Sequence, residues 1–226
     1  WKARLKNSLS TRHVVLPGAI IDRQMLSGYV KVLMKKKPAM IRVFPSPLHE
    51  VAEFIVSEGI DGIRLKGVIT TGEPLYAYQR EAITRAFHCP VFDAYRTREA
   101  GPIAQECEYH DGMHTNAESL YIEVADGQII GDGKDITGEV VVTDLLNFGM
   151  PLIRYRMGDF ATFSDVPCPC GRGLPIIKRV EGRAGDIFYT PDRKKIPTSA
   201  LVLYLIDEAP GLIGQIQVIQ DRCDHV

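Results

Sequence analysis

Short apolar runs and segments with helical spacing alternate along the first part of the chain. Apolar runs at 39–44, 63–69 and 90–94 predict strands. In the segments 24–36 and roughly 76–87, apolar residues recur every three or four positions, which predicts helices. Such alternation is typical of an open parallel sheet flanked by helices, so we expect an α/β fold here.

A further helix is predicted after the first strand, with Ser46 as its N-cap and Pro47 at its first helical position. Its apolar face consists of residues spaced three and four apart: Leu48, Val51, Ala52, Phe54 and Ile55. In open parallel sheets, ligands bind beyond the carboxyl ends of the strands. Two polar segments are predicted to be strand-to-helix loops at that edge, Thr70–Pro74 and Asp93–Glu99.

The pattern changes near residue 118, where short β-rich runs are separated by polar turns that contain glycine. This spacing predicts a small antiparallel barrel or sheet, with strands at 120–124, 139–144 and 151–156. A third pattern begins near Gly182–Asp186 and includes a short helix near 198–207 and a strand at 215–219. It predicts the start of a small α+β domain.

Composition and charge narrow the classes of protein. The 226 residues hold 27 Lys and Arg against 28 Asp and Glu, so no overall basic field favours nucleic acid or an acidic membrane. No apolar run approaches the roughly 20 residues of a membrane helix. The chain starts at Trp1 without an initiator Met or a signal-peptide core, which indicates a piece of something longer.

The cysteines favour a metal site over disulfides. The chain contains Cys89, Cys107, Cys168, Cys170 and Cys223. Because their number is odd and no secretory signal accompanies them, a reducing cytoplasm is the expected location. Two pairs of soft ligands separated in sequence can close a tetrahedral structural zinc site. Here these are Cys168 and Cys170, one residue apart, and Cys107 with a histidine, for which His110 and His114 compete. The alternative is a set of unrelated free thiols.

The segment Asp93–Glu99 combines an aromatic ring, a hydroxyl and a carboxylate. Tyr95 can stack on a base, Thr97 can contact a phosphate oxygen, and Glu99 can hold Mg²⁺, which prefers oxygen ligands. The alternative is a polar surface loop in which Glu99 pairs with Arg96 or Arg98. In the segment Thr70–Pro74, glycine and small hydroxyls let the backbone approach a ligand closely.

A second candidate nucleotide contact lies in Pro151–Asp159, which is predicted to be a strand ending in a Gly158-Asp159 turn. A carboxylate held rigidly after a strand can accept hydrogen bonds from both hydroxyls of a ribose. The alternative is an ordinary turn aspartate flanked by ion pairs.

Taken in order, these motifs resemble the adenylate-forming superfamily, in its phenylacetate–coenzyme A ligase and capsular-polysaccharide-type branch. The resemblance covers nearly the whole chain. It is carried by Thr71-Gly-Glu-Pro-Leu75, Asp93-Ala-Tyr-Arg-Thr-Arg-Glu99, Gly138-Glu-Val-Val-Val-Thr143, Pro151-Leu-Ile-Arg-Tyr-Arg-Met-Gly-Asp159, Cys168-Pro-Cys-Gly-Arg172 and Gly182-Arg183. Arg96 and Arg98 depart from the Gly and the Thr or Ser that are usual in the second motif.

The resemblance implies a ligase that joins a carboxylic acid to ATP, releases pyrophosphate and transfers the acyl group to coenzyme A. It implies Thr97 as the α-phosphate contact, Glu99 as the Mg²⁺ ligand and Asp159 as the ribose ligand beside Arg183. It favours His114 over His110 in the structural zinc site. The remaining nucleotide-binding residues that it implies are Thr71, Gly72, Glu73, Pro74, Asp93, Ala94 and Tyr95.

The resemblance also implies a domain organisation. Residues 1–117 would be part of the large adenylating domain, 118–182 a β-rich subdomain with the zinc knuckle, and 183–226 the hinge and a truncated C-terminal domain, with Gly185-Asp186 at the hinge. The family's phosphate loop would precede Trp1 and its catalytic lysine would follow Val226. We therefore expect little activity from this chain alone.

The expected partners are a small carboxylic acid, ATP and coenzyme A, with a possible homodimer and with neither nucleic acid nor membrane. Two alternatives remain open at this point. In the first, the chain is a non-catalytic module that is stabilised by zinc and binds AMP or a partner. In the second, the chain belongs to an adenylating enzyme of polysaccharide or cofactor assembly, which uses another acceptor.

Overall fold

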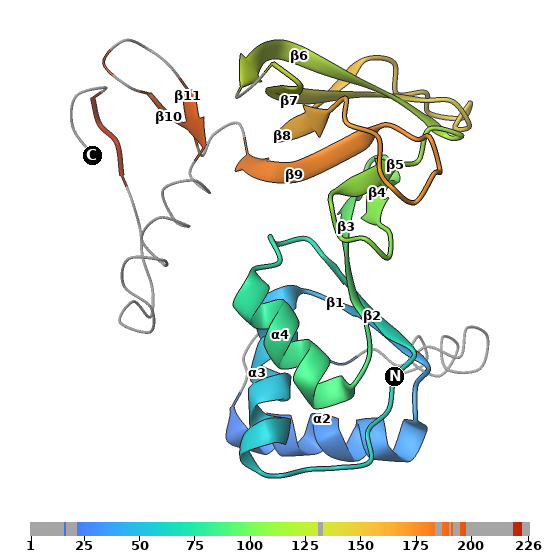
Figure 1. Ribbon diagram of the computed structural model, residues 1–226, viewed down its shortest axis with the longest axis vertical. Coiled ribbons are helices and arrows are strands. Elements are labelled where there is room, and N and C mark those ends of the chain that lie inside the picture. The colour runs from blue at the N-terminus through green and yellow to red at the C-terminus, as the bar shows by residue number, and fades with distance from the viewer. Residues whose placement is uncertain are drawn as a thin grey trace. The chain divides into compact units, whose positions relative to one another are not determined.

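The computed structural model describes residues 16, 22–130, 133–183, 187–189, 191, 195–197 and 219–222. The chain divides into two compact units, Trp1–Val91 and Phe92–Val226, which are shown in Figure 1. Among the described residues, no helix is both long enough and apolar enough to cross a membrane. The predicted hinge at Gly185-Asp186, the helix near 198–207, residues 215–218 of the strand predicted at 215–219, and Cys223 lie outside the described residues.

The first unit combines two parallel strands with helices. Strands β1 (Met40–Val43) and β2 (Gly67–Thr71) pair in parallel, from Met40 opposite Gly67 to Val43 opposite Thr70. The helices are α2 (Arg23–Lys36), α3 (Pro45–Ser57) and α4 (Ala77–Phe87), and α3 packs against both α2 and α4. The apolar core between these elements contains the fully buried side chains of Val68, Ile83 and Phe87. The predicted α/β character of this part is confirmed.

Helix α3 begins at Pro45, two residues earlier than expected, so the prediction of Ser46 as N-cap and Pro47 as first helical residue is wrong. The N-cap is Phe44, whose side chain makes no capping hydrogen bond. The carboxylate of Glu73 takes that role from a distant segment, because its Oε2 accepts from Ser46 N at 3.3 Å and from Ser46 Oγ at 2.6 Å. A cap supplied from 27 residues away leaves no local signal.

The second strand also lies later than predicted. It covers Gly67–Thr71 instead of 63–69, and residues 63–65 have no regular structure. Ile63 and Leu65 are nevertheless buried in the core of the first unit. Their apolar character therefore reflects burial of an irregular segment, which a pattern of apolar residues cannot distinguish from a strand.

The predicted strand-to-helix loop at 93–99 is wrong. Strand β3 (Val91–Thr97) continues through most of this segment, and β4 (Gly101–Glu106) returns antiparallel to it after a short turn. The turn is closed by Ala100 N, which donates to Thr97 Oγ1 at 3.1 Å. A Thr–Arg–Glu–Ala sequence suits a hairpin turn as well as a loop, and the β-forming residues before it continue the strand.

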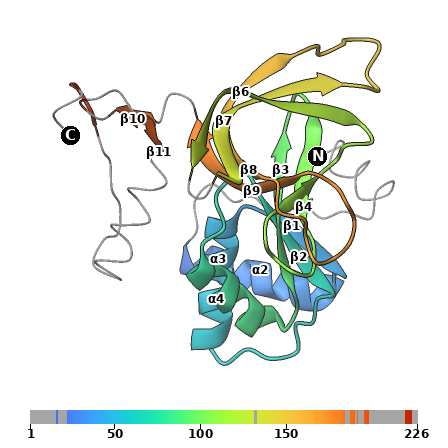
Figure 2. The ribbon, with the colours of Figure 1, turned by 45° about the horizontal axis from the view of Figure 1, so that its top comes forward.

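The second unit is an antiparallel sheet. Besides β3 and β4 it contains β5 (Met113–Thr115), β6 (Leu120–Ile130), β7 (Asp135–Asp144), β8 (Tyr155–Ser164) and β9 (Ile176–Arg183), in the order β3-β4-β5-β9-β8-β7-β6. The long strands β6–β9 curve strongly (Figure 2). A separate hairpin is formed by β10 (Ile187–Tyr189) and β11 (Lys195–Pro197).

The prediction of a strand that ends in a turn at Gly158-Asp159 is also wrong. The strand begins at Tyr155, so residues 151–154 precede it, and the Gly158-Asp159 pair lies inside the strand instead of in a turn after it. The positive φ of Arg154 at 48° and its backbone hydrogen bond to Thr143 Oγ1 mark the entry to the strand. The apolar Pro-Leu-Ile run before it is therefore a structured loop.

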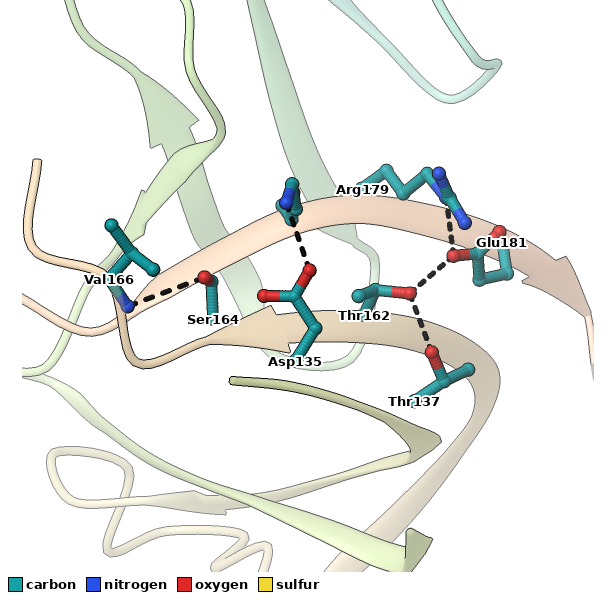
Figure 3. A network of polar contacts seen from close by, with 8 residues as sticks. Asp135, Thr137, Thr162, Ser164, Val166, Arg179 and Glu181 are labelled. Carbon is teal, nitrogen blue, oxygen red and sulfur yellow. Dashed lines mark hydrogen bonds and ion pairs between the residues drawn. The ribbon is translucent and has the colours of Figure 1, made fainter. Parts of the chain in front are cut away.

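A buried polar network joins three strands of this sheet (Figure 3). The hydroxyl of Thr162 on β8 lies 2.7 Å from the hydroxyl of Thr137 on β7 and donates to Glu181 on β9. Arg179 Nε donates to the same oxygen of Glu181 at 2.6 Å. Thr162 and Glu181 are almost completely buried, so the network satisfies polar groups that would otherwise be costly to bury.

The network predicts a stability defect for Thr162→Val. Valine fills the same volume, but the Thr137 hydroxyl and the Glu181 carboxylate lose a partner within a buried site. The expected loss in the free energy of unfolding is about 1–3 kcal/mol, measured by urea denaturation. The matched control is Thr84→Val on the exposed surface of α4, which should change stability by less than about 0.5 kcal/mol. Equal effects of the two substitutions would contradict the importance of the network.

Candidate nucleotide and metal sites

Asp159 is presented by a bulge in β8. Glu139 of β7 pairs with Phe160, and Val141 pairs with Arg156, so three residues of β8 face a single residue of β7. Gly158 within this bulge has a φ of 69°, a conformation that glycine adopts without strain. Bulges redirect side chains, and they are common beside functional sites. The bulge explains the Gly-Asp motif better than the expected turn.

The Asp159 carboxylate is held by one hydrogen bond and one ion pair. The hydroxyl of Tyr95 donates to Oδ2 at 2.6 Å, and Arg183 Nε lies 3.1 Å from Oδ1. Arg183 also donates through Nη1 to the carbonyl oxygen of Met157, at 3.4 Å. Burial, and then the hydrogen bond to Asp159, raises the pKa of Tyr95 far above its ordinary range. The structure thus brings together three residues that the sequence implied for the nucleotide, on β3, β8 and β9.

The other predicted residues of this segment lie along β3 and its turn. The backbone N–H of Asp93 donates to Glu106 Oε2 at 2.8 Å, and Ala94 is buried. Thr97 closes the turn, and Glu99 is exposed within it. Within the described ranges, no ion pair joins Glu99 to Arg96 or Arg98, and Glu99 belongs to no cluster of three potential metal ligands. A magnesium ion here would need oxygens from a nucleotide.

The segment Thr71–Pro74 belongs to the first unit. Gly72 has a φ of 86°, and a Cβ at this position would lie only 2.3 Å from the ring of Phe44. The positive φ and the close approach of the Phe44 ring both favour glycine at this position. The carboxylate of Glu73 contacts Ser46, which fixes this segment against the start of α3. The hydroxyl of Thr71 is buried without a hydrogen-bond partner.

A cluster of thiols and one imidazole gathers in the second unit. Cys107 follows β4, His114 lies in β5, and Cys168 and Cys170 lie between β8 and β9. Their ligand atoms all lie within 4.8 Å of one another. The Sγ atoms of Cys107 and Cys168 are 3.6 Å apart, and Cys170 Sγ is 3.2 Å from His114 Nε2.

The geometry distinguishes between the two candidate histidines. His110 contacts Glu106 Oε2 through Nδ1 at 3.0 Å and is not part of the cluster. His114 directs Nε2 at the thiols and is 8% exposed.

The cluster fits a zinc ion by the chemistry and spacing of its donors. Two sulfur ligands of one tetrahedral zinc, each at about 2.3 Å, lie roughly 3.8 Å apart, close to the 3.6 Å seen between two of these thiols. The Cys170 N–H lowers the pKa of Cys168, but desolvation and the neighbouring thiols outweigh it and raise that pKa to about 11. Crowded thiols resist ionisation together, and a bound cation removes that conflict.

An ion pair that sequence reasoning missed joins the two halves of the cluster. Arg172, two residues after Cys170, donates through Nη1 to Glu108 Oε2 at 3.0 Å, and Glu108 follows Cys107 directly. The sequence could have indicated this ion pair, because a positive and a negative side chain lie next to the two cysteine segments. The hydroxyl of Tyr95 was also missed as a partner of Asp159, because only its ring was considered.

The comparisons find relatives of this chain among proteins named phenylacetate-coenzyme A ligase and CapK. Phenylacetate-coenzyme A ligase of Aromatoleum evansii is 30% identical over 205 residues, which cover 87% of this chain and 45% of that protein. Protein CapK of Staphylococcus aureus is 28% identical over 211 residues, covering 91% of this chain and 44% of CapK. No model of a known protein family matches the chain.

A solved structure shares the fold. The structure of 2-hydroxyisobutyryl-CoA ligase in the postadenylation state, in complex with R3-HIB-AMP, aligns with a TM-score of 0.69 and 26% identity. The match covers 92% of this chain and 45% of that chain. The chain spans about half the length of the curated relatives it matches.

The fold and these likenesses define a member of the adenylate-forming superfamily. Within that superfamily, the chain belongs to the phenylacetate–coenzyme A ligase-like branch. The resemblance read from the ordered motifs is thereby confirmed.

Proposed function

We propose that this chain carries nucleotide-binding and zinc-binding parts of an ATP-dependent acyl-coenzyme A ligase. In the first half-reaction, a carboxylate oxygen of the acid attacks the α-phosphorus of ATP, and pyrophosphate leaves. In the second, the thiol of coenzyme A attacks the acyl carbon, and AMP leaves. The observation that best supports this proposal is the buried Asp159 carboxylate, oriented by Tyr95 and Arg183.

In this proposal, Asp159 accepts hydrogen bonds from the ribose hydroxyls, and Arg183 lies beside it. Tyr95, with Asp93 and Ala94, contacts the adenine. The segment Gly72–Pro74 of the first unit stays a candidate nucleotide contact by the family resemblance alone. Thr97 contacts the α-phosphate, and Glu99 would help to hold a magnesium ion, which would offset phosphate charge.

The zinc has a structural role in this proposal. Cys107, His114, Cys168 and Cys170 would fill all four tetrahedral positions and leave none open for chemistry. The ion would tie the end of β4 and β5 to the connection between β8 and β9. A reducing cytoplasm is compatible with the free thiols of the cluster.

The proposal predicts tight binding of a stable mimic of the acyl-adenylate. Phenylacetyl-sulfamoyl-adenosine and 2-hydroxyisobutyryl-sulfamoyl-adenosine carry both the acyl group and the adenosine. At least one of them should bind this chain on the order of a hundredfold more tightly than AMP, as expected for mimics of a reaction intermediate. Isothermal titration calorimetry measures this, with sulfamoyl-adenosine lacking an acyl group as the matched control.

The outcomes of this titration separate an enzyme from a binding module. Tighter binding of an acylated mimic than of the control indicates an acyl site beside the nucleotide site. Equal affinity of all the adenosine compounds would favour a module that binds AMP without catalysis. Failure of every adenosine compound to bind would contradict the proposed nucleotide site.

A further inference from the structure

The hydroxyl of Tyr95 has a place in the site that the stacking role of its ring does not explain. Tyr95 lies in β3 with 8% of its surface exposed, and its hydroxyl donates to Asp159 Oδ2 at 2.6 Å. A ring that only stacked on adenine would serve equally well as phenylalanine. The hydroxyl therefore has a separate role, and it acts on the carboxylate.

Asp159 is held from two strands that are not neighbours in the sheet. Tyr95 comes from β3 and Arg183 from β9, and β4 and β5 lie between these strands in the sheet order. The two contacts involve different oxygens: Tyr95 donates a hydrogen bond to Oδ2, and Arg183 forms an ion pair with Oδ1. A hydrogen bond on one oxygen and an ion pair on the other restrict the plane of a carboxylate whose terminal torsion is otherwise broad.

The fixed carboxylate keeps acceptor capacity. A carboxylate has about four lone-pair sites, and the two contacts described occupy two of them. The phenol remains protonated at neutral pH, because burial and Asp159 raise the pKa of Tyr95. Tyr95 therefore donates a hydrogen bond to Asp159 and leaves the other acceptor sites of the carboxylate available to a ligand hydroxyl.

We propose that the hydroxyl of Tyr95 is a positioning group, which orients the Asp159 carboxylate to receive the two vicinal hydroxyls of a nucleotide ribose. The inference rests on the proposed function, since it assigns a role within the same nucleotide site. It adds a prediction that the ring alone does not make: the hydroxyl contributes to affinity only when the ligand carries ribose hydroxyls.

The test compares Tyr95→Phe with the wild-type chain, using AMP and 2′,3′-dideoxy-AMP in isothermal titration calorimetry. In the wild type, AMP should bind more tightly than the dideoxy compound. In Tyr95→Phe, the affinity for AMP should fall on the order of tenfold, as for the loss of one charge-assisted orienting contact. The affinity for dideoxy-AMP should stay unchanged, which also shows that the variant is folded. Tyr121→Phe, at an exposed tyrosine of β6, is the matched control and should change neither affinity.

Each other outcome has a definite meaning. An equal loss for AMP and dideoxy-AMP in Tyr95→Phe, or no loss for either, overturns the positioning role while leaving the nucleotide site in place. A wild-type chain that binds AMP and dideoxy-AMP equally, or binds neither, overturns the ribose assignment itself, and the positioning role with it.

Discussion

Removing the zinc site is expected to destabilise the second unit strongly. The purified chain should contain about one zinc ion, and His114→Ala should lose it, because the imidazole would supply one of four ligands. An ion present at about a thousandfold its dissociation constant stabilises a fold by roughly 4 kcal/mol. For a chain of this size, that corresponds to a fall of about 10 °C in melting temperature. Metal analysis and thermal melts followed by circular dichroism measure the two effects.

His110→Ala is the matched control for this prediction. His110 lies four residues before His114 but contacts Glu106 outside the cluster, so its substitution should leave the zinc content at the wild-type value. The double variant Cys168→Ser with Cys170→Ser should behave like His114→Ala. A wild-type chain without metal, or His110→Ala and His114→Ala with the same zinc content, would be incompatible with the proposed site.

The second large effect is expected for Asp159→Asn. Asparagine keeps the volume of the buried side chain but removes its charge and one acceptor oxygen. Hydrogen bonds to charged groups contribute about 1.5–3 kcal/mol each. The affinity for AMP should therefore fall by roughly tenfold to a hundredfold, measured by isothermal titration calorimetry on the full chain.

The control for Asp159→Asn is Asp126→Asn, at an exposed aspartate of β6 that pairs with Arg156. It should leave AMP affinity unchanged. Urea denaturation of both variants separates binding from folding. If Asp159→Asn lowers the free energy of unfolding by as much as it lowers the binding free energy, Asp159 is a structural residue. An unchanged AMP affinity would exclude the ribose contact.

The sequence predicted well those features that repeat along the chain. The helix at 24–36 and the strand at 120–124 have periodic apolar residues, and the strand at 139–144 contains a continuous apolar run. The structure has α2, β6 and β7 at these positions. The spacing of apolar residues depends on which side of a helix or strand is buried, so these elements can be recognised from one sequence. The clustering of the three cysteines with a histidine was also predictable from the sequence, and the structure brings these side chains together, while zinc binding stays a prediction.

Other features depend on contacts between distant segments. The start of α3 is fixed by Glu73, and the direction of Asp159 by a bulge that exists only where β8 pairs with β7. The choice of His114 over His110 depends on the fold of the turn between β4 and β5, in which His110 has a positive φ of 54°. None of these contacts has a period or a local motif, so single-sequence reasoning misplaced the helix start and the Gly158-Asp159 turn.

The contact between Glu73 and Ser46 has a consequence for the entropy of ligand binding. A loop that is free before binding loses backbone freedom when a ligand orders it, at about 1–2 kcal/mol per fixed residue. The segment after β2 is already attached to the start of α3 by the Glu73 carboxylate, and Phe44 packs against Gly72. Its ordering accompanies folding instead of binding. A nucleotide that contacts its backbone would meet a preorganised surface, and little of the interaction free energy would be lost to conformational entropy.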